Sequence, residues 1–88
     1  MKQIKLSGRE LAVLRSIDYA VGSSGDEIRE RTLIESDELA GILNGLCDVG
    51  YVEMFPTVNV VTAENYADSK FEINPSYSQQ LKEAMRRR

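Results

Sequence analysis

The fold is decided by residues 24–52, which read SGDEIRERTLIESDELAGILNGLCDVGYV. Ser24 followed by Glu27 forms a capping box, which predicts a short helix from residue 25 to about Leu33, with Ile28 and Leu33 facing inward. A tight turn then leads into a second helix, for which Ser36 is the predicted N-cap and Gly50 the predicted C-cap. The buried stripe of this second helix falls at helical spacing on Leu39, Ile42, Leu43 and Leu46.

The residues before these two helices predict one more helix. Ser7 and Glu10 form a capping box, and the apolar stripe that follows extends as far as Val21. Gly22 and the serines after it end the helix and open a turn. The stripe is expected to face a shared core with residues Leu11, Leu14, Ile17 and Val21.

The residues after the two helices of the motif predict a small sheet and a last helix. Residues 51–55 and 70–74 read as two strands, and the thirteen residues from Thr57 to Ser69 that lie between them are too many for a tight hairpin turn. A third short strand is expected there, on Val58, Val60 and Val61. Ser76 and Gln79 form a third capping box, for a C-terminal helix over about residues 76–88.

This order of caps and buried positions resembles the winged helix-turn-helix superfamily, in the runs Asp26–Thr32, Asp37–Leu43 and Gly50–Val52. The resemblance extends from Leu6 to Ile73. It implies an α+β fold in one domain over residues 1–88, with a three-helix core, a β-hairpin wing at about 51–74 and a C-terminal helix. It also implies a role in transcription regulation, in which the second helix of the motif and the wing approach DNA.

The charge of the chain conflicts with that role. Residues 32–69 contain no lysine or arginine but seven acids, whereas the rest of the chain holds eleven bases and seven acids, which gives the net charge of −3. DNA affinity depends first on bases that displace counterions from phosphates, so we expect this stretch to repel DNA. The seven acids are Glu35, Asp37, Glu38, Asp48, Glu53, Glu64 and Asp68.

The exposed positions of the second motif helix form the candidate interaction surface. Of these, only Asn44 offers the amide group used to read adenine in a major groove. Gly41 and Gly45 predict either a flat surface where a partner docks, or a close approach by the first helix or wing strand of the same chain. By helical spacing the exposed positions are Asp37, Glu38, Gly41, Asn44, Gly45 and Asp48.

The long wing and the bases leave further alternatives open. The wing is too apolar to stand free in water, so it either packs on its own sheet or crosses to a partner. The clustered arginines either contact DNA phosphates or are solvated charges that cap helices. The wing candidates are Val58, Val60, Val61 and Tyr66. The candidate phosphate contacts are Arg29, Arg31, Arg86, Arg87 and Arg88.

The composition of the chain argues against several classes of protein function. The chain has 88 residues, no histidine, and Cys47 as its single cysteine, which is expected to be a buried small hydrophobe. It shows no metal-ligand pattern and no phosphate-binding glycine loop, so we expect no cofactor and no enzyme activity. It lacks an apolar run long enough for a membrane span or a signal peptide, which predicts a cytoplasmic protein. We therefore expect a module that binds protein, or itself as a homodimer, with a DNA-binding regulator as the alternative.

Overall fold

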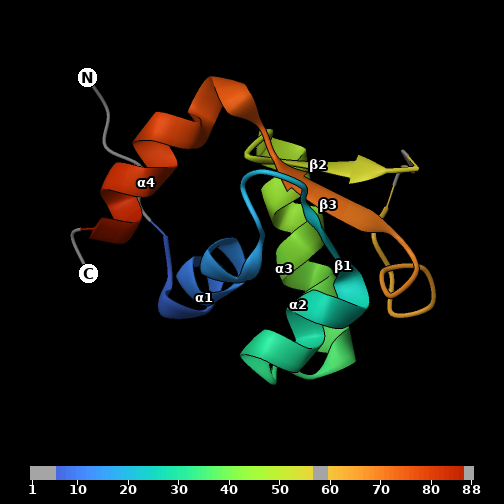
Figure 1. Ribbon diagram of the computed structural model, residues 1–88. Helices are drawn as coiled ribbons and strands as arrows, with labels where there is room; N and C mark the ends of the chain where they lie inside the picture. Colours follow the sequence, from blue (N-terminus) through green and yellow to red (C-terminus); the bar gives the residue numbers. More distant parts are fainter. Residues whose placement is uncertain (1–5, 57–59, 87–88) are drawn as a thin grey trace.

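The computed structural model describes residues 6–56 and 60–86, in which three helices and a small sheet are followed by a C-terminal helix (Figure 1). Figure 1 places α4 and the loop that joins β2 to β3 at opposite ends of the molecule, with α1, α2 and α3 between them. The elements are α1 (Gly8–Ser16), β1 (Ser23–Ser24), α2 (Gly25–Thr32), α3 (Ser36–Val49), β2 (Val52–Phe55), β3 (Lys70–Ile73), the 3-10 turn η1 (Pro75–Tyr77) and α4 (Ser78–Arg86).

The sheet is antiparallel and has the strand order β1-β3-β2 in the described residues. Its third strand is β1, and it pairs Ser23 with Phe71 of β3. The predicted third strand in the wing is therefore wrong at the residues that the structure describes. Val60 and Val61 lie in a loop rather than a strand, and Val58 lies outside the described residues.

Two of the three predicted capping boxes are confirmed. The Ser7 hydroxyl accepts from the Glu10 amide at 3.1 Å, and the Glu10 carboxylate accepts from the Ser7 amide at 2.8 Å. The same reciprocal pair joins Ser24 and Glu27, at 3.1 and 2.9 Å. These boxes satisfy amide groups that the first turn of a helix leaves without partners, so they fix where α1 and α2 begin.

The N-cap of α3 differs from the prediction. Glu35 occupies the cap position without a side-chain cap bond, and Ser36 is the first helical residue. The Ser36 hydroxyl instead makes a 2.9 Å hydrogen bond with the Tyr66 hydroxyl, thirty residues further along the chain. The C-cap is as predicted, because Gly50 has φ 92°, a left-handed conformation that glycine adopts without a steric penalty.

Helix α1 ends at Ser16, earlier than its apolar pattern predicts. The Asp18 carboxylate accepts from the amides of Ala20 and Val21, at 2.7 and 3.2 Å, and this local turn competes with continuation of the helix. Val21, predicted to complete the buried stripe, is consequently 62% exposed.

Leu33 was expected to face inward and does not. It is the C-cap of α2, with φ 59° in the left-handed region, and its side chain is 86% exposed. A leucine in this conformation is strained, because its Cβ crowds the backbone. The turn between α2 and α3 thus places a large apolar side chain in water.

The C-terminal helix begins differently from its predicted capping box of Ser76 and Gln79. The Asn74 side chain accepts from the Ser76 amide at 3.0 Å, and Pro75 opens the turn η1 before α4 starts at Ser78. The ring of Tyr77 packs edge-on against the ring of Tyr51, with 5.0 Å between the ring centres, and joins this end to the sheet.

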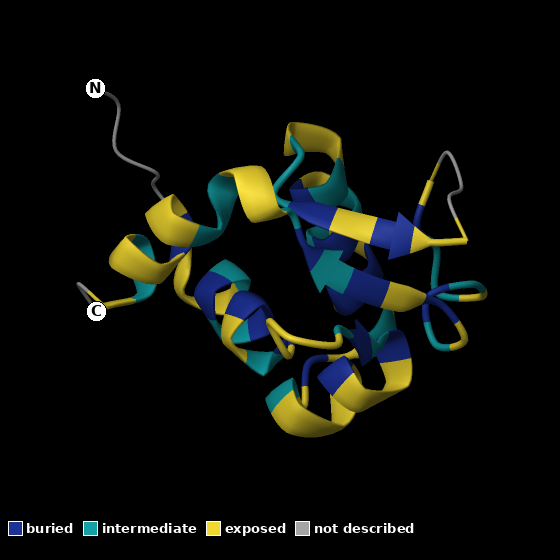
Figure 2. Ribbon diagram, turned by 45° about the horizontal axis from the view of Figure 1, so that its top comes forward, coloured by how far each residue is buried: buried dark blue, intermediate teal, exposed yellow. Residues whose placement is uncertain are grey.

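One apolar core lies between the three N-terminal helices, the inner face of the sheet and α4, and Figure 2 shows the buried residues gathered there. The predicted stripes of α1 and α3 supply much of it, which confirms the placement of both helix faces. Fully buried side chains include Leu14, Ile28, Leu39, Leu43, Leu46, Phe71 and Leu81.

Candidate interaction surface

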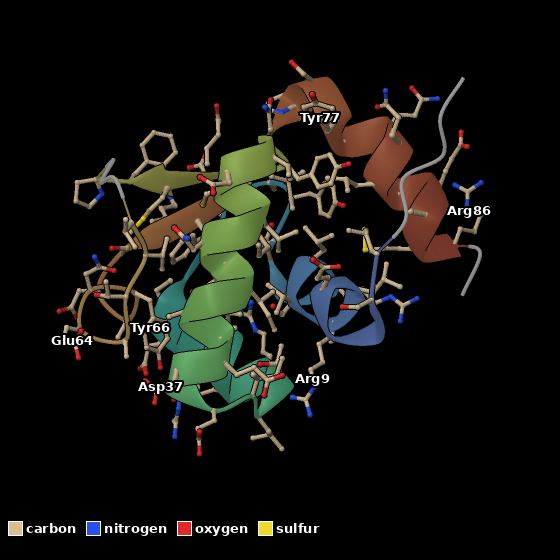
Figure 3. All side chains as sticks on the ribbon, turned by 180° about the vertical axis from the view of Figure 1, so that it is seen from behind. Arg9, Asp37, Glu64, Tyr66, Tyr77 and Arg86 are labelled. Atoms are coloured by element: carbon tan, nitrogen blue, oxygen red, sulfur yellow. The ribbon has the colours of Figure 1, made fainter. Side chains whose placement is uncertain are left out.

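The outward side of α3 carries the predicted surface, which we call the α3 face: Asp37, Glu38, Gly41, Asn44, Gly45 and Asp48. All of these residues are exposed except Asn44, which is half-buried. Their spacing follows one side of the helix, opposite the buried leucines. In Figure 3, α3 lies across the front of the molecule, and Asp37 lies near its first turn.

Asn44 was predicted to be the residue best suited to reading a base, but its side chain has another partner. Its carbonyl oxygen accepts from the Val61 amide at 3.1 Å, so the side chain holds the wing against α3. Bidentate recognition of adenine needs both this oxygen and the amide nitrogen. The structure therefore engages this oxygen in a contact within the chain, although its second lone pair is not used by that bond.

Gly41 and Gly45 face open space. A Cβ atom built on either glycine would meet no described atom within 4 Å, apart from the backbone of its own helix. Close approach of α1 or of the wing strand, the second explanation that the sequence allowed, does not occur among the described residues. At these two positions the α3 face has no side chain and is open to solvent.

The wing segment, residues 60–69, folds back onto the helices. Tyr66 is only 3% exposed, and Val61 is buried as well, so neither lies on the surface where a partner would touch it. The Gly25 amide donates to the Ser69 carbonyl at 3.0 Å, and a Cβ on Gly25 would overlap the Tyr66 carbonyl. Of the four wing candidates, Val60 is exposed and Val58 lies outside the described residues.

All seven acids of residues 32–69 are exposed. Glu38 is paired, because the Arg9 Nε lies 3.0 Å from its carboxylate oxygen, in an ion pair open to water. Asp37 and Glu64 lie on the same side of the molecule in Figure 3, with Arg86 at the far end. The acidic surface thus continues from the α3 face onto the wing.

Besides Arg9, two arginines of the first two helices make contacts within the chain. Arg31, a predicted phosphate contact, donates to the Ser16 carbonyl at 2.6 Å and to the Ser23 hydroxyl at 2.9 Å. Arg15 donates to the Met85 carbonyl at 2.8 Å. Both arginines therefore satisfy carbonyl groups in the last turn of a helix, α1 and α4 respectively, where a positive charge is favourable.

The remaining described arginine candidates and two lysines lie away from the outward side of α3. Arg29 is exposed on α2, and Arg86 is exposed at the end of α4, while Arg87 and Arg88 lie outside the described residues. Lys70 lies 3.7 Å from the Glu72 carboxylate, and Lys82 lies 5.1 Å from the centre of the Tyr19 ring. The described bases therefore do not gather beside the α3 face.

A groove of about 400 Å³ lies between α3 and β2. Sequence reasoning missed this groove, because its walls come from segments that are separate in the chain. Cys47 lines it and is half-buried, rather than fully buried as predicted. Burial, together with the charge of Asp48, raises the pKa of the Cys47 thiol to about 11. The groove is lined by Asn44, Cys47, Asp48, Gly50, Val52, Glu53, Met54, Phe55, Val61 and Asn74.

Two other kinds of site are absent from the described part of the chain. Groups of three or more metal-ligating side chains do not occur within it. Its helices are too short or too polar to cross a membrane.

Neither a protein-family model nor a curated protein matches this chain. A solved structure does: the multiple antibiotic-resistance repressor (MarR) from Listeria monocytogenes, with a TM-score of 0.75 and 20% sequence identity. The match covers 92% of this chain and 52% of the repressor, so the chain spans about half of that protein. The chain has the winged helix-turn-helix fold that its sequence predicts.

Proposed function

We propose that this winged helix is a non-catalytic, cytoplasmic module that binds protein through its α3 face as part of a regulatory complex. The observation that carries the proposal is the charge of that face and of the wing. Seven exposed acids, with no lysine or arginine between residues 32 and 69, occupy the surface that a winged helix would turn toward DNA. Such a surface repels phosphates rather than displacing their counterions.

The shape of the α3 face supports the same proposal. Gly41 and Gly45 leave two neighbouring positions of this face without side chains, where another helix can approach closely. Each glycine in a helix interior costs about 1 kcal/mol relative to alanine, and contacts among the described residues give no reason for that cost. Charge would orient such a partner, and burial of apolar surface would supply most of the affinity.

A DNA-binding transcription regulator is the second candidate. It is supported by the repressor that shares the fold, and by the exposed Arg29 and Arg86. In this case DNA would contact the arginines of α2 and of the C-terminus rather than the α3 face. Replacing Arg86, Arg87 and Arg88 by alanine would then flatten the salt dependence of DNA binding.

A photo-crosslinking amino acid at Gly45 separates the two candidates, because a side chain there meets open space. Gln80 on α4 is the matched control, since it is also exposed on a helix. The proposal predicts a protein adduct in cells from position 45 that position 80 does not give. A nucleic-acid adduct at position 45, or identical adducts at both positions, would contradict it.

The partner can also be a second copy of this chain. We propose a two-fold homodimer in that case, since this is the commonest symmetry of small oligomers. Val60→Asp is the appropriate test, because Val60 is 53% exposed, whereas a change at Tyr66 would disturb the core. Sedimentation of the unmodified chain only as a 9.9 kDa monomer at micromolar concentration would rule the homodimer out.

A further inference from the structure

Leu33, at the turn between α2 and α3, is unfavourable in two ways. Its side chain is 86% exposed, and its φ of 59° is a left-handed conformation in which a side chain crowds the backbone. Glycine is the residue most often found at such a position, because it avoids this crowding. Strained residues that the surrounding structure maintains gather at functional sites, so Leu33 is a candidate for one.

The turn holds Leu33 in place. The Leu33 amide donates to the Arg29 carbonyl at 2.8 Å. The Thr32 hydroxyl donates to the Ile28 carbonyl at 2.9 Å and accepts from the Ile34 amide at 3.3 Å. Ile34 is only 5% exposed and belongs to the core. Because these bonds and the burial of Ile34 fix the backbone on both sides, the Leu33 side chain stays in water unless another molecule covers it.

A hollow of about 290 Å³ lies beside Leu33 and is lined in part by Leu33 itself. The buried Ile34 also contributes to its lining, and the other lining residues are one exposed base and two exposed acids. Figure 1 shows this turn at the lower end of the molecule, away from α4. We call the surface the turn patch: Arg29, Glu30, Leu33, Ile34 and Glu35.

We propose that the turn patch binds the turn patch of a second copy of this chain across a two-fold axis. A contact of this symmetry brings the same surface of both copies together, so the surface must complement itself. The turn patch does so in shape, because the Leu33 side chain of each copy enters the hollow of the other copy. It also does so in charge, because Arg29 of each copy faces Glu30 and Glu35 of the other copy.

The mixed charge of the turn patch disfavours other macromolecules. A nucleic acid would set its phosphates against Glu30 and Glu35. A strongly acidic or strongly basic protein would leave either these two acids or Arg29 facing a like charge, which weakens an interface. A second copy carries both signs of charge in the same arrangement and avoids both losses.

The turn patch is small, so the contact is expected to be weak. It has far fewer residues than the roughly 20–30 on each side of a stable interface, and association should need about 0.1–1 mM protein. Such a contact acts when two copies are held near each other, because tethering raises their effective concentration to about the millimolar range. It lies outside the α3 face, does not depend on the proposed function, and is separate from a homodimer that forms at micromolar concentration.

Sedimentation equilibrium of the full chain at up to about 1 mM tests the contact. Leu33→Gly should weaken self-association by about tenfold or more, although the same change should stabilise the fold of the dilute chain. Val21→Ala is the matched control, because Val21 is also an exposed apolar residue but lies outside the turn patch, and it should leave the affinity within about twofold. A chain that stays monomeric throughout, or a dimer that persists unchanged in Leu33→Gly, would overturn the proposal.

Charge reversals locate the contact. Arg29→Glu makes every charge of the turn patch negative, and Glu30→Arg with Glu35→Arg makes every charge positive. Each of these variants should self-associate about tenfold or more weakly, whereas a mixture of the two should associate again, because opposite charges then face each other. Arg86→Glu makes the same charge change as Arg29→Glu at the end of α4, and it should leave the affinity within about twofold. Equal losses in Arg29→Glu and Arg86→Glu, or a mixture that stays monomeric, would overturn the proposal.

Failure of this proposal is distinguishable from failure of the proposed function. If position 45 crosslinks a protein and the chain never self-associates, the α3 face is retained and the contact through the turn patch is wrong. If Leu33→Gly dissociates a dimer and position 45 gives a nucleic-acid adduct, the turn patch stands and the protein-binding role of the α3 face is wrong. A dimer that is lost in Val60→Asp but not in Leu33→Gly would place the second copy on the wing, which also overturns the proposal.

Discussion

The α3 face with its wing and the α1–α4 end of the molecule use their charged side chains differently. On the α3 face and wing all seven acids are exposed, and Glu38 forms an ion pair that is open to water. At the other end, Arg15 and Arg31 donate to backbone carbonyls of α4 and α1. The acids are therefore available to a partner, whereas these two arginines already hold helices together.

This contrast shows why a count of charges does not identify a nucleic-acid surface. The stretches outside residues 32–69 have an excess of bases, and on that ground alone they could contact phosphates. Part of that excess caps helix ends instead, as Arg31 does at Ser16. What matters for binding is which charges remain unengaged on one continuous face.

The largest expected effect concerns the wing segment and compares two glycines. Gly25→Ala should destabilise the fold by about 1–3 kcal/mol or more, because the new Cβ would overlap the Tyr66 carbonyl. Gly41→Ala, on the open α3 face, should stabilise it by up to about 1 kcal/mol. Urea denaturation measures both changes. A neutral Gly25→Ala would mean that the wing segment does not pack against α2.

A smaller effect is expected from two arginines on α2. Arg31→Ala should cost about 1 kcal/mol, since it removes charged hydrogen bonds to Ser16 and Ser23 that are only partly shielded from water. Arg29→Ala is the control on the same helix and should change stability by less than about 0.5 kcal/mol. Equal values in thermal or urea unfolding would contradict the structural role of Arg31.

Replacing Leu33 by glycine is expected to stabilise the fold. The left-handed conformation costs a leucine about 1–2 kcal/mol, and glycine avoids this at an entropic cost of about 0.5–1 kcal/mol. Leu33→Gly should therefore stabilise the fold by about 0.5–1 kcal/mol. A clear loss of stability would show that the exposed side chain packs against something in the folded state, such as a partner copy.

Cys47 should give the smallest effect, which is kinetic. Since burial and Asp48 raise its pKa to about 11, the unreactive thiol prevails at pH 8, and alkylation should accelerate steadily as the pH rises toward 11. Asp48→Asn removes the smaller cause, lowers the pKa and should speed alkylation at pH 8. A rate that levels off near pH 8.5, the ordinary thiol range, would contradict the buried setting of Cys47.

Features fixed by local sequence could be predicted. The capping boxes at Ser7 and Ser24 and the glycine C-cap at Gly50 depend on residues within one helical turn, and all three are confirmed. The apolar stripes of α1 and α3 also identified much of the core, because helical spacing alone determines which side chains share a face.

Features that depend on distant segments could not be predicted. Ser36 matches the pattern of an N-cap, but its hydroxyl bonds Tyr66, which no local pattern reveals. The sequence leaves open whether Tyr66 and Val61 pack within the chain or against a partner, and only the return of the chain onto α2 and α3 buries them. The groove beside β2 also depends on residues 60–69 returning onto the helices, because Val61 forms part of its lining. The left-handed conformation of Leu33 and the exposure of its side chain could not be predicted, because leucine carries no sequence signal for a left-handed turn.

We predict that this chain does not bind duplex DNA tightly and sequence-specifically, because its α3 face and wing carry seven exposed acids. Selection from a pool of randomised duplexes, followed by anisotropy titrations at increasing salt, tests it most directly. At about 0.15 M salt we predict no enriched sequence and no affinity near the ~10⁻⁸ M of specific complexes. An enriched sequence bound that tightly, with an affinity that falls steeply as salt rises, would contradict the claim.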